Sequence, residues 1–286
     1  MGVLIKPQTD STSGILRTVA ITPESAGWQY VSFAVYHLTR GQAFHGAADG
    51  RETVLVVLSG IGKAELNGQP LEQIGERLSV FEETPAYALY LSEDARYQVE
   101  CTSDVMQIAV ASAPTTHAHL PARLIRPEDV SVELRGEGNT QRRVQHILDI
   151  DQEAERLIVV EVITPAGNWS SFPPHKHDTE NPPYEAYLEE TYYHHVQPAD
   201  GFAFQRVYNY EGFDETVAVH DGDLVLVRKG YHVVSAAPGF DNYYLNVMAG
   251  PNRVWSYQVD PAFHRLLPPS GKITGSIVRP SGGKVG

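Results

Sequence analysis

Short apolar runs separated by turn residues recur along most of this chain, and this pattern restricts the fold more than any other feature. The runs are four to eight residues long and are flanked by Gly, Pro, Asn or Asp, as β-strands are. Many short strands at close spacing predict an all-β protein, a sandwich or a barrel. A helical period is weak throughout, and Gln141–Asp151 is the best candidate for a short helix. Strands are expected at Thr53–Leu58, Tyr87–Leu91, Leu157–Thr164, Thr191–Val196, Phe202–Tyr208, Thr216–Val219, Leu224–Val227 and Tyr243–Met248.

The strand pattern repeats within the chain. Residues 51–101 and 190–250 share a rhythm of strand, turn, strand, short loop, strand and strand, which indicates a weak internal duplication. A length of 286 residues suits two domains. The expected organisation is an N-terminal barrel over 1–115, a connecting segment over 116–150, a C-terminal barrel over 151–268 and an arm or tail over 269–286.

Charge and composition restrict the partners of the chain. The 22 Lys and Arg residues against 35 Asp and Glu residues give a net charge of −13, which disfavours nucleic acid and anionic membranes as partners. An anionic substrate must therefore be met by a local cation or a metal. The single cysteine, Cys101, excludes an internal disulfide and is more typical of buried packing than of a nucleophile. No apolar run approaches the length of a membrane helix and no signal-peptide pattern is present, so a cytoplasmic protein is expected.

Three histidines and a glutamate form the main candidate for chemistry. His175 and His177 are two residues apart, so on a strand both imidazoles face the same side. Glu190 begins a later strand, and His232 follows a turn at Gly230. A His-x-His pair alone is more often a surface pair or a satisfied buried pair than a ligand set. Three imidazoles and one carboxylate are, however, a normal ligand set for a divalent transition metal.

The order of these residues is that of the paired motifs of the cupin fold, and the chain resembles a known family. The stretches SSFPPHKHD, EETYYH, GFAFQRVY, DETVAV, DGDLVLVRKGYH and YYLNVMAGP are similar to the 5-deoxy-glucuronate isomerase family of myo-inositol catabolism. A related family contains the uronate ketol-isomerases of pectin breakdown. The resemblance is strongest over 165–255 and implies two cupin barrels of the jelly-roll type in tandem.

The resemblance also implies one divalent metal, zinc or manganese, held by His175, His177, Glu190 and His232. One departure concerns the loop 178–189, which is longer than the corresponding loop of most cupins and leaves Glu189 and Glu185 as alternative carboxylates. Glu190 is preferred because it is in phase with Tyr192. Residues 1–115 contain no His-x-His, and no histidine follows Pro85 in the way that His232 follows Gly230, so a metal-free barrel is expected there.

The implied reaction is the conversion of 5-deoxy-D-glucuronate to 2-deoxy-5-keto-D-gluconate, an aldose–ketose isomerisation. Lewis-acid polarisation of adjacent sugar oxygens acidifies the hydrogen between them and stabilises an enediolate. His194 and Tyr192 are candidate catalytic residues, although either His194 or His195 must point away from the cavity. Arg206 is the candidate for the substrate carboxylate, with a structural ion pair to Asp214 or Glu215 as the alternative. Further substrate-binding candidates are Gln205, Tyr244 and Asn246.

Two other functions remain open from the sequence alone. A cupin with three histidines and one glutamate can also be an iron-dependent dioxygenase, which requires oxygen. A non-enzymatic sugar-binding protein with two cupin barrels would bind without turnover and leave the ligand set unexplained. A sugar-acid substrate and assembly into a homo-oligomer are expected of the isomerase.

Overall fold

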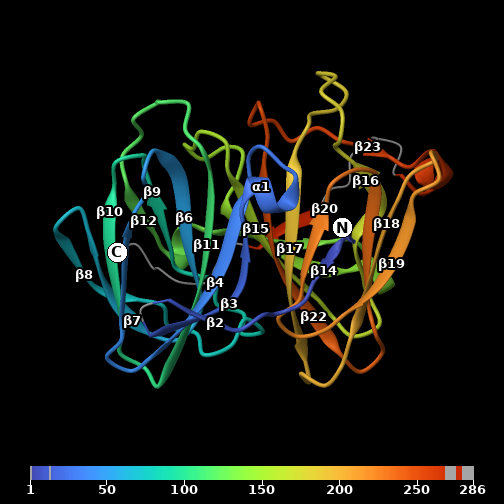
Figure 1. Ribbon diagram of the computed structural model, residues 1–286. Coiled ribbons are helices and arrows are strands. Elements are labelled where there is room, and N and C mark those ends of the chain that lie inside the picture. The colour runs from blue at the N-terminus through green and yellow to red at the C-terminus, as the bar shows by residue number, and fades with distance from the viewer. Residues whose placement is uncertain (1, 13, 268–274, 279–286) are drawn as a thin grey trace, which may run out of the picture.

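A computed structural model describes residues 2–12, 14–267 and 275–278 and confirms an all-β protein (Figure 1). Its helical segments are short, and none in the described part of the chain could cross a membrane. They are α1 (Pro23–Ala26) and the 3-10 turns η1 (Pro127–Asp129), η2 (Gly138–Thr140) and η3 (Pro261–Leu266).

The first half of the chain forms two antiparallel sheets. The larger contains β2 (Asp10–Thr12), β3 (Ile15–Ile21), β4 (Ser32–Thr39), β6 (Arg51–Ser59), β9 (Ala88–Leu91), β11 (Val105–Pro114) and β12 (Arg123–Ile125). Its strand order is β12-β9-β6-β11-β4-β3-β2. The smaller contains β5 (Ala43–Ala47), β7 (Gly62–Leu66), β8 (Gln69–Ile74) and β10 (Arg96–Cys101). Its order is β5-β10-β7-β8.

The second half repeats this arrangement. Its larger sheet contains β1 (Leu4–Ile5), β13 (Ser131–Arg135), β14 (Arg142–Leu148), β15 (Ile158–Thr164), β17 (Glu189–Gln197), β20 (Leu224–Val227), β22 (Asp241–Ala249) and β24 (Gly275–Val278). Its order is β1-β20-β17-β22-β15-β14-β13-β24. The smaller sheet contains β16 (Trp169–Lys176), β18 (Ala203–Tyr208), β19 (Asp214–Val219), β21 (Tyr231–Ala236) and β23 (Gln258–Val259). Its order is β19-β18-β21-β16-β23. In the strand orders of the two larger sheets, β6, β11 and β4 occupy the places that β17, β22 and β15 occupy.

The two large sheets pack against each other in the middle of the molecule (Figure 1). Alternate residues of a strand face opposite sides of its sheet, and this periodicity builds three layers of apolar core. In β6, Val54 and Val56 face the second half of the chain, whereas Leu55 and Val57 face the interior of the first barrel. The central strands are therefore buried on both faces, which explains why they are nearly continuous apolar runs.

Two buried carboxylates tie the halves together in a reciprocal way. Glu52 in β6 accepts the backbone N–H groups of Glu155, Arg156 and Leu157 at 2.6, 2.8 and 2.8 Å. Glu189 in β17 accepts those of residues 29–31 at 2.7, 2.8 and 2.9 Å. Each carboxylate thus accepts the backbone N–H groups of a loop in the other half, the loop before β15 for Glu52 and the loop before β4 for Glu189. Buried N–H groups without a hydrogen-bond partner would be costly.

The region expected to connect the halves contains regular structure. β12 joins the first large sheet, while β13 and β14 belong to the second. The short helix predicted over Gln141–Asp151 is wrong, because these residues include β14, whose backbone pairs with β13 and β15. The non-local pairing overrides a weak local helical preference. Of the predicted tail over 269–286, residues 275–278 pair with β13 and the rest lies outside the described residues.

Replacing Glu52 by Gln is expected to lower the free energy of unfolding by about 2 kcal/mol or more, because an amide nitrogen then faces buried N–H donors. Urea denaturation followed by circular dichroism measures the change. Glu65→Gln, at an exposed position of β7, is the matched control and should change stability little. Equal stability of the two variants would show that the Glu52 contacts contribute nothing.

Candidate metal centre

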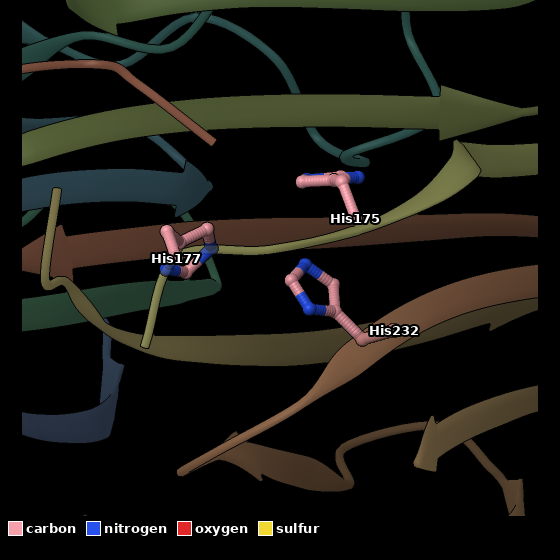
Figure 2. Close-up of side chains that lie close together, drawn as sticks. All are labelled: His175, His177 and His232. Atoms are coloured by element: carbon pink, nitrogen blue, oxygen red, sulfur yellow. The ribbon is translucent and has the colours of Figure 1, made fainter. Parts of the chain in front are cut away.

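His175, His177 and His232 lie together at one end of the second barrel (Figure 2). His175 is near the end of β16, His177 immediately follows that strand, and His232 is the second residue of β21. β16 and β21 are paired so that His175 is opposite His232. One ring nitrogen from each of the three histidines lies within 4.8 Å of the other two. The three buried imidazoles could therefore hold one metal ion.

A backbone carbonyl lies at the Nδ1 atom of each imidazole. The distances are 3.1 Å from His175 Nδ1 to the Pro173 oxygen and 3.0 Å from His177 Nδ1 to the Leu188 oxygen. His232 Nδ1 lies 3.5 Å from the Gly230 oxygen. A carbonyl oxygen only accepts, so this arrangement favours the tautomer with hydrogen on Nδ1 and a free lone pair on Nε2.

Glu190 is the carboxylate closest to these nitrogens. Its Oε2 atom lies 3.0 Å from Nε2 of both His177 and His232, and its Oε1 accepts a 2.7 Å hydrogen bond from Asn246. Burial alone would raise the pKa of Glu190, but the neighbouring His232 and His177 hold it well below its usual value. Burial, together with the two other histidines, lowers the pKa of His175 well below its usual range. Glu190 is therefore held as an anion, the form in which a carboxylate binds a metal. Burial alone would lower the pKa of His177, but the charge of Glu190 raises it.

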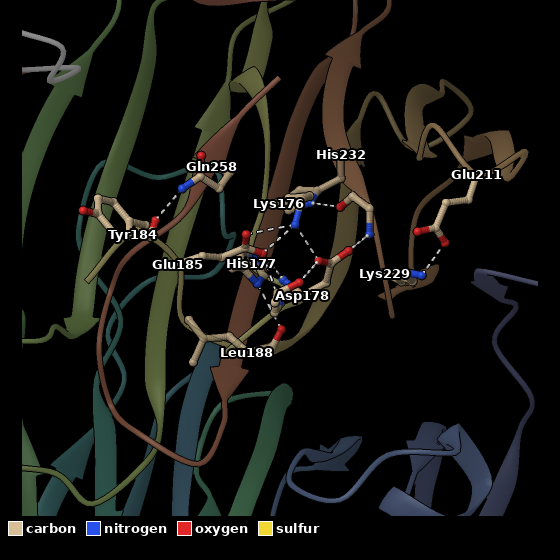
Figure 3. A network of polar contacts seen from close by, with 12 residues as sticks. Lys176, His177, Asp178, Tyr184, Glu185, Leu188, Glu211, Lys229, His232 and Gln258 are labelled. Carbon is tan, nitrogen blue, oxygen red and sulfur yellow. Dashed lines mark hydrogen bonds and ion pairs between the residues drawn. The ribbon is translucent and has the colours of Figure 1, made fainter. Parts of the chain in front are cut away.

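The two alternative carboxylates are engaged elsewhere, and Figure 3 shows the contacts of Glu185. Glu189 points to the opposite face of β17, where it binds residues 29–31. Glu185 accepts hydrogen bonds from Lys176 at 2.8 and 2.9 Å and from the N–H groups of Asp178 and Thr179. The long loop 178–189 thus folds back on Lys176 and leaves Glu190 facing the histidines.

The same network fixes the relative positions of the histidine-bearing segments (Figure 3). Asp178, next to His177, accepts a 2.7 Å bond from Lys176 and a 2.8 Å bond from the N–H group of Gly230. Gly230 has a φ of +101° and its Cα approaches the Tyr208 carbonyl too closely for a side chain. A glycine is therefore required two residues before His232.

The polar atoms at the centre fit a metal ion. Nε2 of His232 is buried and, although Glu190 is 3.0 Å away, it has no hydrogen-bond partner among the described residues. A buried polar nitrogen without a hydrogen bond is costly unless a ligand meets it. Three imidazole nitrogens and a carboxylate are the donors that divalent transition metals prefer.

A cavity of about 360 Å³ lies next to the histidines. Strand periodicity determines its lining, because alternate residues of β13, β14, β15, β22 and β17 face the barrel interior. Tyr192, Tyr244 and Asn246 line it together with His175 and Glu190. Three of the predicted substrate or catalytic residues therefore lie beside the candidate metal centre.

His194 and Gln205 are buried behind this cavity rather than in its wall. His194 Nε2 lies 2.9 Å from Gln205 Oε1, and its Nδ1 lies 3.1 Å from Asn242 Oδ1. Burial lowers the pKa of His194. His195 points the other way, toward Asp221 and the first barrel, as the alternation of a strand requires.

The structure does not bring Arg206 to the cavity. Gln205 faces the barrel interior, so Arg206 is on the outer face of β18 with its side chain 44% exposed. There its guanidinium forms a bidentate ion pair with Asp214 at 2.8 and 2.7 Å. The structural alternative considered for Arg206 is the one observed.

Charged residues that the sequence analysis missed line the cavity instead. Glu133 and Arg135 come from β13, and Arg142 and His146 come from β14. Although burial favours the neutral imidazole, Asp149 and Glu133 raise the pKa of His146 to about 9. The alternation of Arg142, Val144 and His146 is a strand signal in the sequence. The expectation of a short helix over Gln141–Asp151 in a connecting segment obscures it.

Fold and site together define a protein with two cupin barrels, the second of which carries a candidate metal centre. The chain belongs to the KduI/IolB family, whose model matches residues 3–266. The resemblance seen in the sequence is thereby confirmed over most of the chain.

Two relatives and one structural neighbour illustrate the match. The 5-deoxy-glucuronate isomerase of Geobacillus kaustophilus is 52% identical over 244 residues, which are 85% of this chain and 88% of the relative. The crystal structure of an IolB-like protein from Salmonella typhimurium LT2 has a TM-score of 0.87 at 43% identity and covers 92% of this chain and 98% of that one. An oxalate decarboxylase from Lactobacillus farciminis has a TM-score of 0.66 at 9% identity, covers 94% of this chain and 91% of its own, and shows the fold alone.

Replacing Glu190 by Gln is expected to weaken metal binding by about 100-fold or more, because the anionic ligand is lost. Glu189→Gln should keep full metal affinity and lose stability, since Glu189 binds the loop at residues 29–31 on the other face of β17. Titration with zinc or manganese, with metal content measured by mass spectrometry, separates the two. Weaker binding by the Glu189 variant alone would assign the ligand to Glu189.

Proposed function

We propose that this chain is a metal-dependent aldose–ketose isomerase that converts 5-deoxy-D-glucuronate to 2-deoxy-5-keto-D-gluconate in myo-inositol catabolism. The observation that carries the proposal is the convergence of three imidazoles and one carboxylate beside a cavity of small-molecule size, whose wall includes His175 and Glu190. The isomerase names of the family relatives identify the chemistry.

In this proposal His175, His177, Glu190 and His232 hold one divalent transition metal, zinc or manganese. When bound, the metal supplies a Lewis acid for sugar oxygens. Asn246 positions Glu190 through the hydrogen bond to Oε1. Holding this ligand in one rotamer is the role that we assign to Asn246, in place of a bond to a sugar hydroxyl.

The reaction moves hydrogen within the substrate and needs no external oxidant. A proton leaves the hydroxyl-bearing carbon next to the aldehyde, and a proton arrives at the former aldehyde carbon. The hydroxyl oxygen loses its proton and becomes the ketone oxygen, while the former aldehyde oxygen gains a proton and becomes a hydroxyl. The protein must therefore supply hydrogen-bond donors beside these oxygens and exclude water from the carbanion-like state.

Tyr192 is the proposed donor. Its hydroxyl is within 2.8 Å of Ser171 Oγ, and the side chain is buried in the cavity wall. Burial and the charge of Glu190 raise the pKa of Tyr192 well above its usual value. Tyr192 consequently keeps its proton at neutral pH and donates to a sugar oxygen rather than acting as a base. Tyr244, whose pKa burial raises to about 12, is a second hydroxyl donor in the same wall.

His194 and Gln205 support the wall from behind. Neither lines the cavity, so we assign them positioning roles under β17 and β22 rather than contact with substrate. Arg206 is excluded from the substrate site by its outward direction and its ion pair with Asp214.

Anaerobic incubation of the zinc- or manganese-loaded protein with 5-deoxy-glucuronate is expected to give the keto product, followed by NMR. Conversion without oxygen separates the isomerase from a dioxygenase, and turnover separates it from a sugar-binding protein. His232→Ala should lose metal and activity together, whereas His220→Ala, at an exposed position, should keep both. A folded, metal-loaded protein that leaves the substrate unchanged would contradict the proposal.

Tyr192→Phe is expected to lower kcat by about 100-fold with unchanged metal content, which is the size of effect typical of a lost hydrogen-bond donor to a developing negative charge. Tyr193→Phe is the matched control, because Tyr193 is the next residue but faces the first barrel and bonds Gln107. Steady-state kinetics on both variants tests the assignment. Similar kcat values for the two would remove Tyr192 from the mechanism.

A further inference from the structure

Arg142 is a buried cation in the cavity that has no carboxylate partner among the described residues. Its side chain is 5% exposed, yet its hydrogen bonds go to two backbone carbonyls, those of Thr140 at 2.9 Å and Phe172 at 3.0 Å. These bonds use two of the five N–H donors of a guanidinium. Burying a charge in this way is costly unless an anion meets it.

The other cavity charges are paired with each other. Arg135 binds both oxygens of Glu133 at 3.2 and 2.6 Å. His146 lies 3.3 Å from Asp149 and 3.5 Å from Glu133. Two carboxylates thus face three cations in this part of the wall, and Arg142 is the cation left over. Burial lowers the pKa of Arg142 to about 10, which still leaves it charged at neutral pH.

The position of Arg142 suits one end of a sugar acid. Its Nη2 atom donates a hydrogen bond to the carbonyl of Phe172, which precedes His175 by three residues on β16. Even fully extended, three residues span at most about 11 Å. An open-chain hexuronate can therefore place its carboxylate at Arg142 while its aldehyde end lies at the histidines.

We propose that Arg142 binds the carboxylate of the substrate and so selects sugar acids over neutral aldoses. This inference rests on the proposed isomerase function and names its specificity residue. It also explains how a chain with a net charge of −13 accepts an anion, because the cation is inside the cavity. A guanidinium suits the task, since its parallel N–H groups match the two oxygens of a carboxylate.

The test compares 5-deoxy-glucuronate with the neutral aldose in which a hydroxymethyl group replaces the carboxylate. Arg142→Gln is expected to reduce kcat/KM for the uronate by about 10- to 100-fold, mainly through KM, because the contact is remote from the reacting carbons. Turnover of the neutral aldose should change by less than about threefold. Arg142→Lys, which keeps the charge but not the paired donors, should fall between wild type and the Gln variant.

Arg143→Gln is the matched control, because Arg143 is the neighbouring residue and reaches out of the cavity to the Glu83 carbonyl. It should leave both substrates unaffected. Equal losses for uronate and neutral aldose in Arg142→Gln would show that Arg142 only supports the fold and would overturn the proposal. If that variant does not fold, the wild type decides: comparable kcat/KM for the two substrates also overturns it.

Calorimetry with D-glucuronate separates this proposal from the isomerase proposal. Wild-type protein should bind the uronate, and Arg142→Gln should bind it at least about 10-fold more weakly. That result would stand even if wild-type protein failed to isomerise 5-deoxy-glucuronate. Unchanged binding in the variant would overturn the role of Arg142 while leaving the isomerase intact.

Discussion

The packing of the two large sheets against each other determines most of this structure. It buries both faces of β6, β11, β17 and β22, so each of these strands contributes alternate side chains to a barrel interior and to the shared layer. Within that layer, Arg77 of the first half forms a buried ion pair with Glu161 of the second, and Tyr243 donates to the same carboxylate. Glu190 of the candidate metal centre lies on the inner face of β17, one of these strands, whereas the three histidines lie on or next to β16 and β21 of the smaller sheet.

Most strands could be predicted from the sequence because apolar runs and turn residues are local signals. The barrel repeat was also visible, since the strand rhythm of 51–101 returns at 190–250. β14 was missed because its partners β13 and β15 supply the pairing that makes it a strand, and a single segment does not reveal its partners. Arg142 of β14 and Arg135 of the neighbouring β13 were therefore not predicted to line a cavity.

The histidines were predictable because strand phase and motif order agree on them. Arg206 was not, because an arginine among apolar residues indicates an anionic partner without saying whether that partner is a substrate or Asp214. The two barrels also differ at matching places. His45 of β5 is opposite Gln98 of β10, whereas His175 of β16 is opposite His232 of β21. A repeated topology therefore carries two imidazoles at this register position in the second barrel and one in the first.

The sequence of β17 places similar side chains on both faces of the strand. Glu190, Tyr192 and His194 face the barrel interior, while Glu189, Tyr193 and His195 face the other half. A shift of one residue in pairing would exchange like for like at Tyr192 and His194, but it would put Thr191 in the place of Glu190. Of these three inner residues, only Glu190 therefore distinguishes the observed alignment of β17 from the shifted one. Pairing with β20 and β22 and the loop bound by Glu189 fix the same alignment, so a carboxylate that faces away from the cavity helps to hold Glu190 beside the histidines.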